Sequence, residues 1–168
     1  MTLNEQLYQN WLLQLQTWAA EGRLLAAGVD ALQLKPGQAT DQLKRVVERL
    51  AKGDTRNLPP IEVLPGSAMP SAAGAYAEST GKIYLNKNWL KSARKREALF
   101  ILTAEFGHHL DAQLNINDTT GDEGSTFASL LLRNSQKRPF RKESGEQDHG
   151  LIFTNNQWIK AELESWTG

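Results

Sequence analysis

The segment from Leu90 to Leu114 constrains the fold more than any other part of this chain. Its apolar pattern is helical, and the longest apolar run of the sequence, Ala98 to Leu102, lies within it. At about 100° per residue, one face of this helix is apolar, with Leu102, Phe106 and Leu110. The opposite face carries ionisable side chains: Glu105, His108 and Asp111. Because such groups are costly to bury without partners, they must face either water or a site.

Length, charge and cysteine content limit the classes of protein to which this chain can belong. The chain has 168 residues, 40% of them hydrophobic, which suffices for one globular domain with a core. Its 19 Lys and Arg balance 19 Asp and Glu, so we expect no nucleic-acid partner, because phosphate neutralisation needs a basic surface. The absence of cysteine excludes disulfides, thiolate metal ligands and a cysteine nucleophile.

No apolar run approaches the ~18 to 20 residues of a membrane span. The first residues lack the pattern of a signal peptide, so we expect either a cytoplasmic chain or a fragment whose export signal lies elsewhere.

The periodicities predict a single α+β domain, with an N-terminal helical part over 1–57 and a sheet with further helices over 58–168. Helices are expected from Leu3 to about Leu34, broken at Gly22 and Gly28, from Thr40 to Lys52, from Leu90 to Leu114, and from Gly121 to about Arg133. Strands are expected at Ile61–Leu64, Ala75–Ala77, Lys82–Leu85, and in a hairpin over Leu151–Leu163 that turns at Asn155-Asn156. The Trp residues of the first helix are expected to pack in the core.

The spacing Glu105-x-x-His108 matches the second half of the zinc motif HExxH. In that motif two His four residues apart bind the metal, and the Glu activates a water molecule. Here Ala104 occupies the place of the first His and offers no ligand atom. The pattern alone is therefore weak.

Three neighbouring features favour a metal site. The segment Ile83, Tyr84 and Leu85 precedes the helix in the sequence. In zincin folds, the edge strand that holds a peptide substrate also precedes the active-site helix. Gly107 keeps one side of the helix thin, so that a neighbour could approach closely. Glu123 shares the inward stripe of the next helix and could complete a His/Glu metal shell, as in gluzincins.

Each of these residues also has a structural interpretation. Thr120-x-x-Glu123 is a capping box, in which Glu123 would satisfy a backbone N–H at the helix start. His109 lies at the border of the apolar face, where a packed or surface imidazole is more common than a ligand. Asp111 could accept a hydrogen bond from the free ring nitrogen of His108, or simply be solvated.

Three segments together resemble a known family: Ala75–Leu85, Leu102–Asn115 and Asp118–Ala128. They are similar to the zincin-like, gluzincin-type metallopeptidase domain of large secreted cyanobacterial proteins, which often also carry calcium-binding repeats. The resemblance extends from about Ile61 to the C-terminal hairpin and, more loosely, over the N-terminal helices. It implies a zincin-like fold with a small mixed sheet, an edge strand, an active-site helix and a second, ligand-bearing helix.

The resemblance also implies roles for individual residues. Glu105 would be the general base, and His108 and Glu123 the metal ligands. Ala104, commonly acidic in the family, would stand at the first-ligand position, with His109, Asp111 and Asp122 as candidate supporting residues. The expected cofactor is Zn, bound more weakly because of Ala104.

The implied activity is metal-dependent hydrolysis of a polypeptide substrate or of the parent chain, at an extracellular or cell-surface location. Ala104 leaves two explanations open, a natural loss of activity or a deliberate substitution. The alternative function is a non-catalytic, zincin-shaped interaction module, and a structural ion held by Glu105, His108 and Asp111 is a third interpretation.

Overall fold

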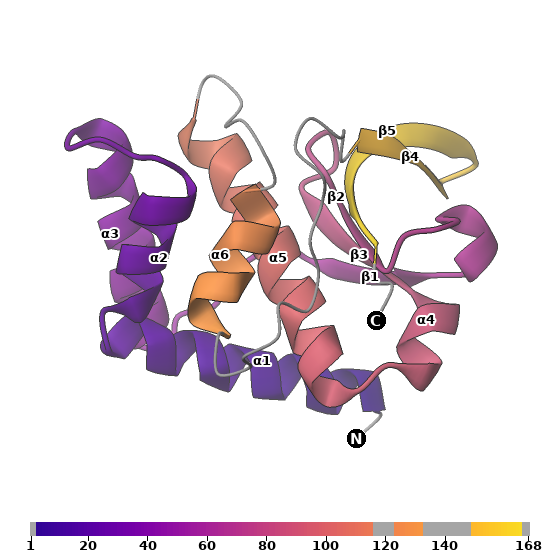
Figure 1. Cartoon of the computed structure of the whole chain (residues 1–168), viewed down its shortest axis with the longest axis horizontal. Coiled ribbons are helices and arrows are strands. Elements are labelled where there is room, and N and C mark those ends of the chain that lie inside the picture. Colours follow the sequence, from indigo (N-terminus) through magenta and orange to yellow (C-terminus); the bar gives the residue numbers. More distant parts are fainter. Residues whose placement is uncertain (1–2, 116–122, 133–148, 166–168) are drawn as a thin grey trace.

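The computed structural model describes residues 3–115, 123–132 and 149–165, and its architecture is α+β, as the sequence predicts (Figure 1). Most of the helices gather on one side of the molecule and a five-stranded sheet lies on the other, together with the short helix α4, while helix α5 lies between them. In chain order the elements are α1 (Leu3–Ala20), α2 (Arg23–Ala31), α3 (Gln38–Ala51), β1 (Ile61–Leu64), the 3-10 turn η1 (Gly66–Ala68), β2 (Gly74–Ala77), β3 (Lys82–Asn86), α4 (Lys87–Ser92), α5 (Lys95–Leu114), α6 (Glu123–Leu131), β4 (His149–Thr154) and β5 (Gln157–Glu164).

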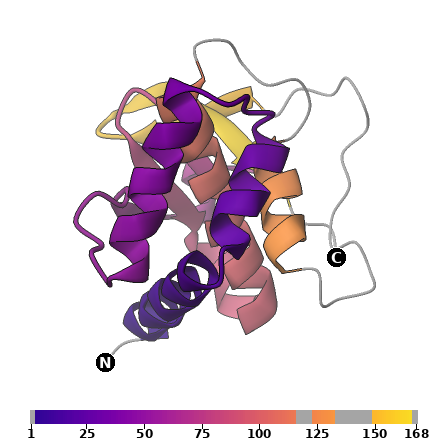
Figure 2. The same ribbon diagram turned by 90° about the vertical axis from the view of Figure 1, so that its left-hand side faces the viewer.

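The N-terminal helices form the outer layer of the helical side, where α2 and α3 stand in front of α5 (Figure 2). The predicted break at Gly22 is confirmed, because its φ of 80° ends the helical path between α1 and α2. The predicted break at Gly28 is wrong, since Gly28 lies inside α2. A Cβ at Gly28 would lie 2.7 Å from Leu43 Cδ2, so this glycine allows α2 to pack closely on α3.

The sheet has the strand order β1-β3-β2-β5-β4. The hairpin of β2 and β3 and the C-terminal hairpin of β4 and β5 are both confirmed. Asn155 and Asn156 have φ values of 52° and 64°. Positive φ angles at both central residues are typical of a two-residue type I′ turn, whose twist matches the right-handed twist of the strands.

The expectation that Ile83, Tyr84 and Leu85 form an edge strand is wrong. They belong to β3, which pairs with β2 on one side and with β1, in parallel, on the other. The chain between β1 and β3 passes through η1 and β2, and this crossover places Ile61–Leu64 beside β3. Strands β1 and β4 are therefore the edges of the described sheet.

The two faces of the sheet pack in separate clusters, because successive strand residues point to opposite sides. On one face Tyr76, Ile83 and Leu85 join the main core beneath the helices. On the other face Tyr84 packs with Ala75 and Ile152 in a smaller cluster beside η1.

The predicted helix from Leu90 to Leu114 is two helices. Ala93 and Arg94 are extended, with ψ angles of 145° and 153°, so α4 ends before α5 begins. The middle of helix α5 is also not divided into an apolar and a solvated face, because Glu105, His108 and Asp111 are buried, as are the apolar residues of the opposite face. The reason is its central position between the sheet, α1 and α6.

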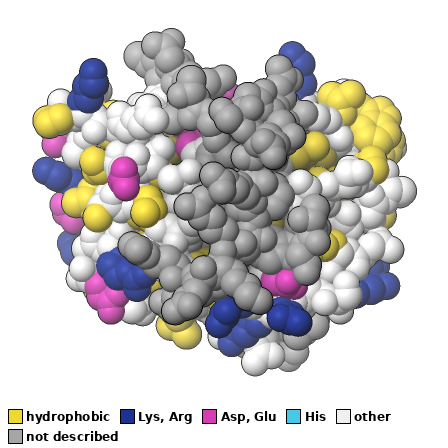
Figure 3. Space-filling view, viewed as in Figure 1, with side chains coloured by type: hydrophobic (Ala, Val, Ile, Leu, Met, Phe, Trp, Pro, Cys, Tyr) yellow, Lys and Arg dark blue, Asp and Glu magenta, His cyan; other side chains and the backbone are white. Residues whose placement is uncertain are grey.

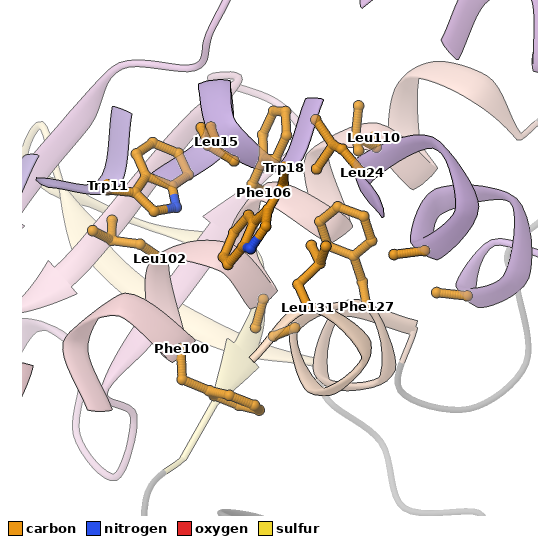
Figure 4. Packing of buried hydrophobic residues seen from close by; sticks show 14 of the residues in the cluster. Trp11, Leu15, Trp18, Leu24, Phe100, Leu102, Phe106, Leu110, Phe127 and Leu131 are labelled. Atoms are coloured by element: carbon orange, nitrogen blue, oxygen red, sulfur yellow. The ribbon is translucent and has the colours of Figure 1, made fainter. Parts of the chain in front are cut away.

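Large apolar side chains from α1, α2, α5 and α6 meet on one side of α5 (Figure 4). Trp11 and Trp18 are buried there, which confirms their predicted role in the core. The Trp11 ring meets Phe106 edge to face, and its Nε1 donates a hydrogen bond of 3.2 Å to Thr103 Oγ1. None of the helices in the described residues has the length and hydropathy of a membrane-spanning segment.

Helices α5 and α6 approach each other closely through glycines. A Cβ at Gly107 would lie 3.1 Å from the Cα of Gly124, and a Cβ at Gly124 would lie 2.5 Å from the carbonyl oxygen of Ala104. The expected thin side of the helix at Gly107 is therefore confirmed, and its neighbour is α6.

Replacing Gly124 by alanine should destabilise the protein by about 1–3 kcal/mol, because the added methyl group forces α6 away from α5. Chemical denaturation of Gly124→Ala and the unmodified chain measures this difference. Thr126→Ala, at an exposed position of the same helix, serves as the control. Equal stabilities of Gly124→Ala and the unmodified chain would show that the helices separate without cost.

Candidate metal centre

His108 lies at the centre of a buried group of carboxylates. Its side chain has no exposed surface. Its Nδ1 lies 2.9 Å from Glu123 Oε1 and also contacts Glu162 Oε2. Its Nε2 lies 3.2 Å from Glu164 Oε1. Both ring nitrogens therefore face glutamates, which come from α6 and β5.

Local structure explains how these side chains meet. Glu123 is the first residue of α6, and the close contact of Gly124 with α5 brings that end of the helix against His108. Glu162 and Glu164 are two residues apart on β5, so both project from the same face of the sheet. Strand β5 pairs with β2, and in this pairing Glu164 lies opposite Gly74. The pairing fixes the position of both glutamates along the axis of α5.

Glu105 lies one helical turn before His108 and is fully buried. A Cβ at Gly74 would lie 3.2 Å from Glu105 Oε2, so the absence of a side chain at Gly74 makes room for this carboxylate beneath β2. Its negative charge acts on the His108 ring. The group thus contains four glutamates and one imidazole.

These carboxylates govern the protonation of His108. Burial alone would lower the pKa of its ring. The hydrogen bonds to Glu123, Glu162 and Glu164, together with the charge of Glu105, outweigh burial and place the pKa well above the ordinary value of 6.5. Without a metal, the ring is therefore a cation held by carboxylates.

The donor atoms suit a divalent cation in kind and in number. His108, Glu123 and Glu162 each offer one ligand atom, and these atoms lie within 4.8 Å of one another. Zinc accepts imidazole nitrogen and carboxylate oxygen at about 2.0–2.2 Å, and catalytic zinc sites use three protein ligands. The group holds four carboxyl groups and one imidazole, so a divalent cation would offset negative charge on the carboxylates that bind it.

The structure brings together three of the residues that the sequence singles out, Glu105, His108 and Glu123. Ala104 is fully buried on the same helix, where its carbonyl lies against Gly124. The capping interpretation of Glu123 depends on Thr120, which lies outside the described residues, as does Asp122.

Two other candidates have different partners. Asp111 accepts a hydrogen bond from the side chain of Asn115. The residue that lies opposite Nε2 of His108 is Glu164, whereas the sequence suggests Asp111 as the acceptor. His109 hydrogen-bonds the Tyr76 hydroxyl through Nδ1 at 3.0 Å and stacks on Phe106. It lines a pocket of about 540 Å³ between α3 and α5, away from the glutamates.

Sequence reasoning missed Glu162 and Glu164. The available signal is their spacing of two residues on a predicted strand, which places both carboxylates on one face. Polar residues at that spacing are also what the solvated face of an antiparallel strand carries, so the pattern does not distinguish a site from a surface.

The site reaches the surface at Glu162. The side chain of Glu162 is 21% exposed, whereas those of His108 and Glu164 are fully buried. On the face of the molecule in Figure 3, the charged side chains of the described residues are scattered and include both signs, without a large area of one sign.

Burial lowers the pKa of His109 to about 4. The unfolded chain, with a His pKa near 6.5, then binds more protons than the folded chain between pH 6.5 and 4, so stability falls as the pH is lowered through this interval. His109→Gln should remove this contribution and flatten the acid side of the profile. Melting temperatures of both proteins from pH 7 to 4, with chelator present, test this, and equal slopes would contradict it.

Comparison with known proteins relates this chain to one protein family. The family model of peptidase family M48 matches residues 37–156, well over half of the chain, and the match includes α3, α5, α6 and the sheet strands β1 to β3. Comparisons with curated proteins and with solved structures give no match. The family model thus supports a metallopeptidase domain, and its span contains Glu105, His108 and Glu123. The chain belongs to peptidase family M48.

Proposed function

We propose that this chain is a metal-dependent peptidase domain whose activity is reduced by Ala104. The observation that carries the proposal is the meeting of Glu123 from α6 with His108 from α5, beside Glu105, within the region that matches the peptidase family. The substrate class that follows is a polypeptide, including the parent chain in a self-processing reaction.

Each residue has a distinct task in this proposal. His108 and Glu123 would hold the cation, which in this family is typically zinc. When bound, such a cation supplies Lewis-acid polarisation of the scissile carbonyl and of a water molecule. Glu105 takes a proton from the attacking water at a carboxylate oxygen and passes it to the leaving amine. Its burial beneath β2 keeps that carboxylate in one orientation.

Ala104 favours a second candidate function, a non-catalytic module with the shape of the peptidase. A methyl group at the first-ligand position cannot bind metal, and the hydrogen-bonded His108 and its glutamates could hold α5, α6 and β5 together without one. In that case the protein would bind a polypeptide without cleaving it.

Glu105→Gln should lower kcat for peptide hydrolysis by about 10²–10⁴-fold while zinc content stays unchanged, because the amide cannot accept a proton. The assay is cleavage of an unfolded protein substrate by the zinc-loaded chain, read by mass spectrometry. Glu62→Gln on β1 removes a carboxylate remote from the site and is the matched control. Equal rates in Glu105→Gln and the unmodified chain would exclude Glu105 as the base.

Ala104→His should raise zinc affinity and peptidase activity, because it restores an imidazole at the first-ligand position. Zinc content by mass spectrometry after purification without chelator measures the first effect, with Ala104→Glu as a second variant. Circular dichroism checks that the buried position accepts the larger side chain. Zinc in none of the three proteins would contradict the metallopeptidase proposal and leave the binding module.

A further inference from the structure

We infer that strand β5 supplies what position 104 lacks: Glu162 is the third protein ligand, the cation binds Nδ1 of His108, and Glu164 holds Nε2. This inference rests on the proposed metal-dependent function and adds two residues and one specific ring nitrogen to it.

Two carboxylates crowd on one ring nitrogen of His108. Glu123 from α6 and Glu162 from β5 both contact Nδ1 of His108, from two different elements. The ligand atoms of these three residues lie within 4.8 Å of one another. A cation in place of the ring proton would therefore meet one nitrogen and two oxygens, which is the ligand number of a catalytic zinc site.

The other ring nitrogen of His108, Nε2, already has a neighbour on each of two elements. A Cβ at Gly124 would lie 2.6 Å from Nε2 and 2.8 Å from Cδ2 of His108, so the backbone of α6 lies close to that edge of the ring. Glu164 Oε1 lies 3.2 Å from Nε2. Histidines that bind metals almost always donate their other N–H to such an acceptor, which fixes the tautomer and the ring orientation.

The two β5 glutamates differ in exposure. The Glu162 side chain is 21% exposed, as expected for a ligand at the mouth of a site that a cation must enter. The Glu164 side chain is fully buried, as expected for a positioning residue behind the ring. Because β5 is hydrogen-bonded to both β2 and β4, neither glutamate needs a rearrangement of the sheet to reach His108.

The test uses the full chain, labelled with ¹⁵N in histidine and titrated with Zn²⁺. Long-range ¹H–¹⁵N spectra of the His108 ring should show a metal-bound Nδ1 and a protonated Nε2. Calorimetry should show that Glu162→Gln weakens Zn²⁺ binding by at least ~10-fold, and that Glu164→Gln weakens it by about 10–100-fold while disturbing the tautomer. Glu78→Gln, which changes the charge equally at an exposed turn, should bind as the unmodified chain does.

Glu162→His guards against a loss of binding through misfolding, because it keeps a ligand at this partly exposed position and should restore Zn²⁺ affinity relative to Glu162→Gln. Zn²⁺ on Nε2, or unchanged affinity in Glu162→Gln, would overturn the inference and leave the proposed function standing. Absence of Zn²⁺ binding in both the unmodified chain and Ala104→His would overturn the proposed function together with it.

Discussion

A single imidazole joined to carboxylates from two other elements holds the centre of this molecule. His108 connects α5 to the start of α6 through Glu123 and to the end of the sheet through Glu162 and Glu164. Buried charges are tolerated only when they are paired, so the three elements cannot shift independently without exposing an uncompensated group. The arrangement of helices and sheet around α5 thus depends on the same contacts that bring the candidate cation ligands together.

Small residues make this meeting geometrically possible. Gly124 lets α6 lie against the His108 ring, and Gly74 leaves space for Glu105 under β2. At each position a methyl group would collide with a neighbouring side chain or backbone atom. The close packing of α5 against α6 and β2 therefore depends on glycines, and a hydrophobic pattern does not reveal this role.

Local patterns are sufficient to predict most elements of the fold and three of the five residues that meet at the candidate site: Glu105, His108 and Glu123. The helix that carries His108, the hairpins and the inward direction of Glu123 follow from periodicity and turn residues over short stretches. Strand order does not, since the parallel pairing of β1 with β3 is decided by a crossover through η1 and β2. Glu162 and Glu164 escaped prediction for the same reason, because only the pairing of β5 with β2 turns an ordinary polar strand face toward α5.

The position of β5 in the chain has a consequence for biosynthesis. Glu162 and Glu164 lie in β5, the last of the described elements. These two residues must therefore emerge from the ribosome before the group around His108 can assemble. Helices α5 and α6 can pack earlier, since they are close in sequence and their contacts are local. A nascent or interrupted chain would thus contain Glu105, His108 and Glu123 but lack the β5 carboxylates that contact the His108 ring. The group of carboxylates around His108 is therefore complete only after β5 has been translated and has paired with β2.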